Sequence, residues 1–323
     1  GKINGLKLQL DLKKGALETD IKSLKKAARQ TIKPELEKRI LNIMETGLIE
    51  LKDDFKIFWN GFPIAKLKAG RDYLNPNFDL IVDEILEAKN IQKLNEYIDK
   101  WIKEKINNTL KSLIDLKNLE NNNSSIKALA YHLYENNGVL KRENVLEYLI
   151  ELKQEDRKIL RELGVKFGRY HIYLYRLIKP DAVTLRTLLW KNYHQKYYDM
   201  FPPTFGLNFL NDNSKKNKNF MLLCGFENFD KFFVRIDILE RLFVQIINLS
   251  DNKSKEIKVV PEMLNLLGCN KDNFKKLLEK MNYKIFEKDE NIFLKYNPIK
   301  KFNKKPEKNK IKNNAFNILK NIN

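Results

Sequence analysis

The alternation of apolar and polar residues predicts short strands near the start of the chain, at residues 3–12, 48–51, 56–59 and 63–67. Asn60-Gly61 separates the last two strands and is a strong hairpin signal, because both residues tolerate a positive φ. Apolar residues at helical spacing predict two helices after the first strand, at residues 21–28 and, beyond Pro34, at 35–45. We therefore expect a small α+β module over residues 1–75.

The middle of the chain has helical periodicity. From Phe78 to Leu119, apolar residues recur three and four positions apart. Further helices are expected over residues 126–135, 145–152 and 154–163, and Ser124 or Ser125 would cap the first of these. These patterns predict a helical bundle over residues 76–200.

Residues 201–298 begin with an aromatic stretch and a polar loop and continue with a regular order of elements. Helices are expected at residues 234–247, 261–267 and 271–281, followed by strands at 283–286 and 292–296. Helix, tight turn, helix and hairpin is the order of a winged-helix-like unit. Such units bind duplexes in some proteins and partner proteins in others. The whole pattern predicts a mainly α (α+β) fold.

The last segment, residues 299–323, is rich in lysine and contains a single acid, Glu307. We expect it to be a disordered tail until it meets a polyanion. A solvated tail with no specific task is the alternative.

Charge points to a polyanionic partner. Sixty-one lysines and arginines against forty-two acidic residues give a net charge of +19, which favours nucleic acid. An AT-rich genome would also enrich lysine, but it would not force lysine to outnumber the acids. The sequence has no apolar run long enough to span a membrane and no secretory start. We expect a cytoplasmic location without membrane contact, and Gly1 in place of methionine favours a fragment of a longer protein.

Motifs that would carry chemistry are missing from the sequence. There is no P-loop, no D-E-x-H run, no nucleophile elbow and no H-E-x-x-H pair. Two cysteines and three scattered histidines do not have metal-ligand spacing. We therefore expect no catalytic residue, metal or cofactor in this chain, and the lack of clustered carboxylates disfavours a self-contained nuclease.

The most informative segment is the central block, residues 163–190, in which glycines four positions apart accompany interleaved cations and aromatics. In one interpretation its cations meet phosphates and its rings stack on unpaired bases. In the other, the aromatics form core and the glycines merely turn the chain, and the residues alone favour neither. The candidate nucleic-acid-binding residues are Lys166, Arg169, Tyr170, His171, Arg176, Lys179 and Arg186.

The run LGVKFGRYHIYLYRLIKPDAVTLRTLLW resembles the L-G-V-R-F-G-x-x-x-[IV]-[FY]-x-x-x-L-[LI]-K-P block of one helicase group. That group is the C-terminal region of alphaproteobacterial superfamily 2 DExH helicases similar to the mitochondrial degradosome RNA helicase. Further segments resemble it in the same order: residues 58–67, 127–131 with 138–140, 234–242 and 261–269.

The resemblance implies an accessory region of an ATP-dependent helicase acting on RNA or an RNA-containing duplex. In that family two RecA-like lobes lie upstream and hold ATP and magnesium, and none of their residues can be placed in this sequence. The chain is then expected to bind nucleic acid and to guide the strand for a motor that it does not contain. The alternative is a protein-interaction module that docks the helicase on a nuclease or ribosomal partner.

Overall fold

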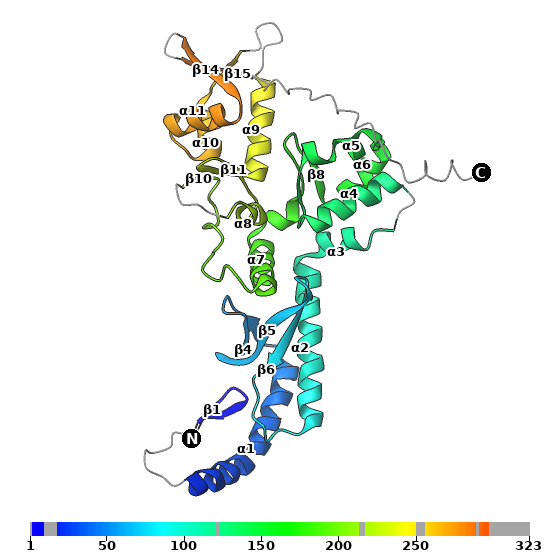
Figure 1. The fold of residues 1–323 in the computed structure, drawn as a ribbon, viewed down its shortest axis with the longest axis vertical. Helices are drawn as coiled ribbons and strands as arrows, with labels where there is room; N and C mark the ends of the chain where they lie inside the picture. The colour runs from blue at the N-terminus through cyan, green and yellow to red at the C-terminus, as the bar shows by residue number, and fades with distance from the viewer. Residues whose placement is uncertain are drawn as a thin grey trace, which may run out of the picture.

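The computed structural model describes residues 2–9, 18–120, 123–212, 217–249, 256–288 and 291–296. The fold is mixed α+β, and the described part is elongated (Figure 1). The N-terminal elements lie at one end, the C-terminal hairpin lies at the other, and the central block lies between them.

The N-terminal module combines two long helices with a curved antiparallel sheet. A hairpin of β1 (Lys2–Asn4) and β2 (Lys7–Gln9) precedes α1 (Glu18–Thr46). The sheet has the order β3-β4-β5-β6 and is followed by α2 (Ala88–Thr109). The predicted Asn60-Gly61 turn is confirmed, because both residues have positive φ between β4 and β5. The sheet strands are β3 (Ile49–Leu51), β4 (Lys56–Trp59), β5 (Phe62–Asp72) and β6 (Asn75–Leu80).

Three expectations for the N-terminal part of the chain are wrong. Helix α1 is continuous through Pro34 instead of breaking there; a proline removes one backbone hydrogen bond, and buried Leu36 and Ile40 hold the following turns in the core. The predicted helix from Phe78 starts only at Ala88, because Phe78 to Leu80 pair with β5 as part of β6. The first predicted strand is instead a hairpin turning at Gly5, and its residues 10–12 lie outside the described residues.

The middle region is not purely helical, which corrects the expected bundle. Its helices are α3 (Lys111–Lys117), α4 (Ser124–Glu135), α5 (Leu146–Glu151) and α6 (Gln154–Glu162). A small antiparallel sheet of order β7-β9-β8 lies among them. Its strands are β7 (Val139–Lys141), β8 (Val165–Phe167) and β9 (His171–Leu174), and the 3₁₀ turns η1 (Arg142–Val145) and η2 (Tyr175–Ile178) follow β7 and β9. The N-cap of α4 is Asn123, whose side chain accepts hydrogen bonds from the backbone amides of Ser125 and Ile126.

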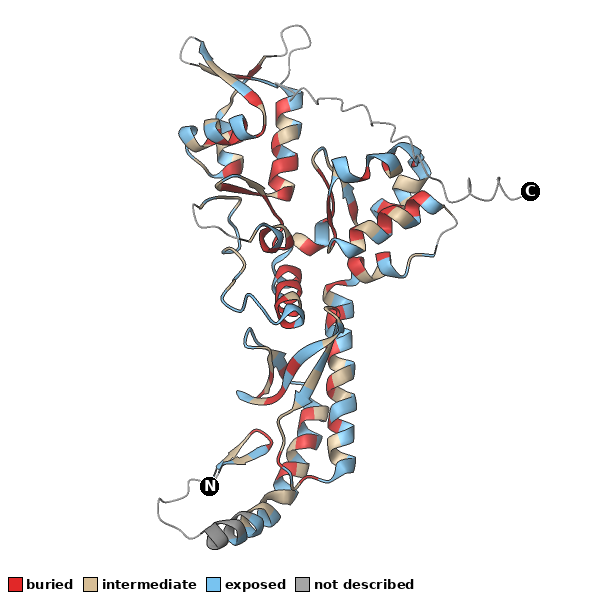
Figure 2. Cartoon of the chain, viewed as in Figure 1, coloured by how far each residue is buried: buried red, intermediate tan, exposed pale blue. Residues whose placement is uncertain are grey.

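Helix α7 (Pro180–His194) is buried along most of its length (Figure 2). One apolar cluster runs from Leu6 in the N-terminal hairpin to Leu189 in α7. Asn192 at the end of α7 also donates a hydrogen bond of 2.9 Å to the carbonyl of Lys68 in β5. The N-terminal module and the middle region therefore share one core.

The C-terminal elements confirm the order expected for residues 234–296. A sheet of order β10-β12-β11 with α8 leads into α9, and a second sheet has the order β13-β15-β14. The second sheet packs with α9, α10 and α11 around a separate apolar cluster that includes Phe274 and Leu294. The elements are β10 (Phe209–Asn211), α8 (Lys218–Leu223), β11 (Phe226–Phe229), β12 (Phe232–Arg235), α9 (Ile236–Asn248), β13 (Ile257–Lys258), α10 (Pro261–Leu267), α11 (Lys271–Lys280), β14 (Tyr283–Lys288) and β15 (Asn291–Tyr296). The lysine-rich tail lies outside the described residues.

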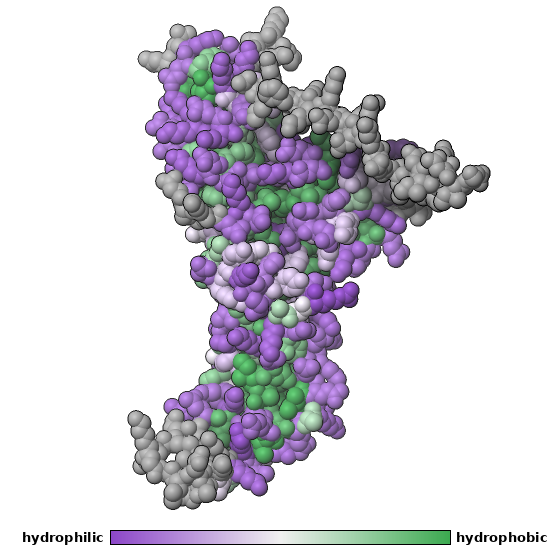
Figure 3. Space-filling view, in the orientation of Figure 1, coloured by the Kyte–Doolittle hydropathy of each residue, from purple (hydrophilic) through white to green (hydrophobic). Residues whose placement is uncertain are grey.

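The surface is mostly hydrophilic on the face drawn in Figure 3, with hydrophobic side chains gathered over the N-terminal module. Among the helices of the described residues, none combines the length and the apolar character that crossing a membrane requires.

Candidate nucleic-acid interface

The central block joins the middle region to the C-terminal elements. Its strands β8 and β9 lie beside α9 (Figure 1). Gly164 has a φ of +93° and turns the chain from α6 into β8. Gly168 has a different role, because a Cβ there would lie 2.5 and 2.6 Å from the carboxylate oxygens of Glu240. The second glycine of the block therefore permits a close approach between the β8–β9 turn and α9.

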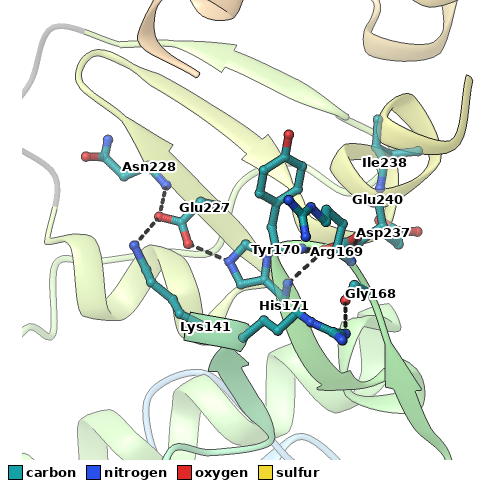
Figure 4. Close-up of polar contacts among 11 residues, drawn as sticks. Lys141, Gly168, Arg169, Tyr170, His171, Glu227, Asn228, Asp237, Ile238 and Glu240 are labelled. Carbon is teal, nitrogen blue, oxygen red and sulfur yellow. Dashed lines mark hydrogen bonds and ion pairs between the residues drawn. The ribbon is translucent and has the colours of Figure 1, made fainter. Parts of the chain in front are cut away.

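Glu240 fastens this turn to α9. Its carboxylate accepts backbone hydrogen bonds from Arg169 at 2.5 Å, Tyr170 at 2.9 Å and His171 at 2.8 Å (Figure 4). The side chain is buried. All three bonds come from consecutive backbone amides of the β8–β9 turn, so this carboxylate holds the turn against α9.

His171 connects the same turn to β11. It is buried, and its Nε2 lies 2.6 Å from Glu227 while its Nδ1 lies 3.6 Å from Glu240. Lys141 is 3.0 Å from the other oxygen of Glu227. Burial acts to lower the pKa of His171, but the two carboxylates outweigh it and raise that pKa above the usual value. Burial acts to raise the pKa of Glu227, but His171 and Lys141 lower it below the usual range.

A hollow of about 680 Å³ opens between the β8–β9 turn and α9. Four cations line it: Arg142, Lys166, Arg169 and Arg241. Within the described residues none of them forms an ion pair with a carboxylate. The acids in the lining are Glu240, held by the amides, and Asp237, which pairs with Arg235 at 2.6 Å. The hollow therefore has an excess of uncompensated positive charge.

Aromatic rings accompany these cations. Phe167 and Phe243 both line the hollow. The guanidinium of Arg169 lies 5.6 Å from the centre of the Phe243 ring, and that of Arg161 lies 5.6 Å from the centre of the Phe167 ring. Arg157 is 5.9 Å from the same Phe167 ring. Cations beside ring faces are a combination that suits phosphates and unpaired bases together.

Arg142 shows how crowded the cations are. Its Nη1 donates a hydrogen bond of 2.9 Å to the carbonyl of Gly168, which also lines the hollow. Burial and the nearby charges of Arg157 and Arg169 lower its pKa, and the charge of Glu240 opposes them only in part. An anion bound in the hollow would relieve this repulsion.

The predicted site residues occupy different environments. Lys166 and Arg169 are exposed and line the hollow together. Arg176 and Lys179 are exposed but lie on η2 and at the start of α7, where Lys179 donates to the Tyr175 hydroxyl. Neither of these two lines the hollow.

Tyr170, His171 and Arg186 are unsuited to direct contact with a strand in this conformation. Tyr170 packs edge-on against Phe243, and its hydroxyl lies 3.3 Å from that of Tyr283. His171 is enclosed by the glutamates described above. Arg186 is fully buried, and burial lowers its pKa to about 10. We therefore leave these three out of the interface.

Sequence reasoning missed the cations that come from outside the central block: Arg142, Arg157, Arg161 and Arg241. Arg157 and Arg161 are four residues apart on α6, and Arg241 lies on the polar side of α9. Helical spacing identifies such faces, but it does not reveal that the two helices flank the same turn.

No group of three or more His, Cys, Asp or Glu side chains that could hold a metal ion occurs in the part of the chain that the structure describes. Comparison of the chain with protein-family models, curated proteins and solved structures found no match.

Proposed function

We propose that this chain is the nucleic-acid-binding accessory region of an ATP-dependent helicase and guides a strand for a motor that the chain does not contain. The observation that carries the binding is the basic hollow between the β8–β9 turn and α9. Within the described residues its four cations form no ion pair with a carboxylate. Of its two acids, Glu240 accepts three backbone amides and Asp237 pairs with Arg235. Phosphate charge supplies most of the attraction in such a site, so binding should be nearly independent of sequence.

The C-terminal elements support this proposal. Helix α9, strand β13, helices α10 and α11 and the hairpin β14–β15, in a sheet of order β13-β15-β14, have the connectivity of a winged-helix unit. The helicase assignment itself rests on the sequence resemblance of the central block, and RNA is the substrate that this resemblance favours.

The test is fluorescence anisotropy of the full chain with labelled single-stranded and tailed-duplex RNA between about 50 and 200 mM salt. The variant Lys166→Gln/Arg241→Gln removes two exposed cations of the hollow. We expect roughly tenfold weaker binding, and a salt slope shallower by about 1.4 to 1.8, because each phosphate contact contributes about 0.7 to 0.9 to that slope.

A matched control removes the same charge elsewhere. Lys89 and Lys93 are exposed at the start of α2, which lies at the N-terminal end of the molecule in Figure 1, away from β8 and α9. The variant Lys89→Gln/Lys93→Gln should bind within about twofold of the wild type, because charges beyond a Debye length of about 8 Å are largely screened. Equal weakening in both variants would show that net charge alone drives binding, and the hollow would be rejected as the site.

A second candidate function is a protein-docking module, which the loop after α7 favours. Exposed rings follow one another in this loop, and Phe201 is 64% and Phe205 51% exposed. Exposed aromatic residues are typical of protein contacts. The anisotropy experiment separates the two functions, because a docking module would bind RNA no better than any protein of its charge.

A further inference from the structure

The sheet β13-β15-β14 has two different faces. Side chains alternate along a strand, and residues opposite each other on neighbouring strands point to the same side. Tyr283, Ile285 and Leu294 pack into the C-terminal core. The intervening residues of these strands therefore form an outer face that points away from that core.

The outer face is basic and aromatic. Phe286 and Phe293 are opposite each other in the β14–β15 ladder and stack with ring centres 5.9 Å apart. Lys258 lies opposite Phe293 on the other side. Neither phenylalanine belongs to an apolar cluster of the described residues. Both rings are half-buried, with the ammonium of Lys288 lying 5.0 Å from the centre of the Phe286 ring.

Two lysines on this face lack a counter-charge. Lys284 and Lys295 lie directly opposite each other, and both are exposed. Within the described residues neither forms an ion pair, although like charges in this position are destabilising. Lys288 by contrast pairs with Glu256 at 2.9 Å. Asp289 and Glu290 lie outside the described residues. Lys284 and Lys295 are next to the Tyr283–Tyr296 pair, so their charge lies at the base of the hairpin.

Helix α11 offers a less favourable surface. In a winged-helix unit this is the helix that would enter the major groove of a duplex. Its Lys275 pairs with Glu287, and its Lys280 pairs with Asp230 at 3.0 Å. Asp272 and Glu279 are exposed on the same helix. Lys271 and Lys276 are also exposed on α11, but the two exposed carboxylates match their charge. The helix therefore has no excess of free positive charge to attract a phosphate backbone.

We infer that the outer face of β13-β15-β14 is a second binding site, which takes single-stranded nucleic acid. Unpaired bases stack on Phe286 and Phe293, while Lys284 and Lys295 neutralise the adjoining phosphates. The inference rests on the nucleic-acid binding proposed above. It adds that this end of the molecule binds the single-stranded part of the nucleic acid. A duplex cannot use the face in the same way, because its bases are stacked on one another.

The experiment measures anisotropy of the full chain with a labelled 12-nucleotide oligo(U) and with a blunt RNA duplex, across the same salt range. In the variant Phe286→Thr/Phe293→Thr we expect single-strand affinity to fall about tenfold or more with an unchanged salt slope. Duplex affinity should change less than about threefold. Phe286→Tyr/Phe293→Tyr should restore single-strand binding, because tyrosine also offers a ring for stacking.

Charge variants supply the matched control. Lys284→Gln/Lys295→Gln should lower the single-strand salt slope by about 1.4, since each contact contributes about 0.7 on a single strand. Lys271→Gln/Lys276→Gln removes two exposed cations of α11 and should affect single-strand binding less. Melting followed by circular dichroism verifies that each variant is folded.

Unchanged single-strand binding in the folded threonine variant would overturn the inference, as would equal weakening for single strand and duplex. If the threonine variant binds single strands as well as the wild type does, while Lys166→Gln/Arg241→Gln weakens binding, the proposed function stands and the inference fails. If only the threonine variant weakens binding, the inference stands and the hollow is rejected as the site. Failure of the wild-type chain to bind RNA would reject both.

Discussion

Position 168 requires glycine, because the carboxylate of Glu240 occupies the space that a side chain would need. In Gly168→Ala the new methyl group would push the carboxylate away from the three amides that it accepts. We expect a loss of about 2 to 4 kcal/mol in the free energy of unfolding, from overpacking and broken buried hydrogen bonds. Urea denaturation measures this loss.

A double-mutant cycle supplies the control for this prediction. Glu240→Ala removes the carboxylate, so Gly168→Ala should cost at least about 1 kcal/mol less in that background than in the wild type. Equal costs in the two backgrounds would contradict the assigned contact. They would show that the glycine is required for another reason, such as backbone freedom.

At the scale of elements, the ion pairs around His171 link β9 to β11 and α9. The pKa of His171 is raised above its usual value of 6.5, so its stabilisation is complete below pH 6.5 and is lost as the pH rises through the raised pKa. The pKa of Glu227 is lowered from 4.5, so its contribution is present above pH 4.5 and is lost as the pH falls through the lowered pKa. The pair therefore stabilises the fold most between pH 4.5 and 6.5.

The variant His171→Gln tests this linkage, because glutamine keeps a hydrogen-bonding side chain without titrating near neutral pH. The thermal midpoint of the wild type should fall between pH 6 and 9 by more than that of the variant. The measurement is a series of melting curves in buffers of constant ionic strength. Parallel pH profiles would contradict an ionised His171 in the folded state. Lys141 and Glu240, which also face this cluster, are the same in both proteins.

The elements that could be predicted from the sequence are those long enough to show a regular spacing of apolar residues. The amphipathic pattern of α9 continues over 13 residues, and α10, α11 and the last hairpin follow with clear turn residues. Strand β9 is buried at all four positions, so it has no alternation to detect. Lys166 and Arg169 could be identified as exposed cations from the sequence. The partners of His171, by contrast, come from 56 and 69 positions away.

For the whole molecule, Arg186 is the side chain that joins the regions. From the centre of α7 its guanidinium donates to the carbonyls of Asn137, Leu177 and Leu223 at 2.5, 3.0 and 2.5 Å. Asn137 follows α4, Leu177 lies in η2, and Leu223 is the last residue of α8. The Arg186 guanidinium therefore connects the middle region to the C-terminal elements. The apolar run around Arg186 in the sequence is the signal for its burial.

The variant Arg186→Met keeps the length of the side chain and removes its donors. Three buried carbonyls lose their hydrogen-bond donor, and removal of the buried charge offsets part of this loss of stability. We expect the free energy of unfolding to fall by about 2 to 4 kcal/mol. Tryptophan fluorescence during urea unfolding measures the change. Trp59 and Trp101 report on the core that the middle region shares with the N-terminal module, and Trp190 reports on the cluster between α7 and α8. RNA affinity of the folded variant should stay within about twofold of the wild type, since a fully buried side chain adds no phosphate contact. Weakening as large as that of Lys166→Gln/Arg241→Gln, with stability unchanged, would mean that Arg186 reaches the strand and that α7 opens when the strand binds.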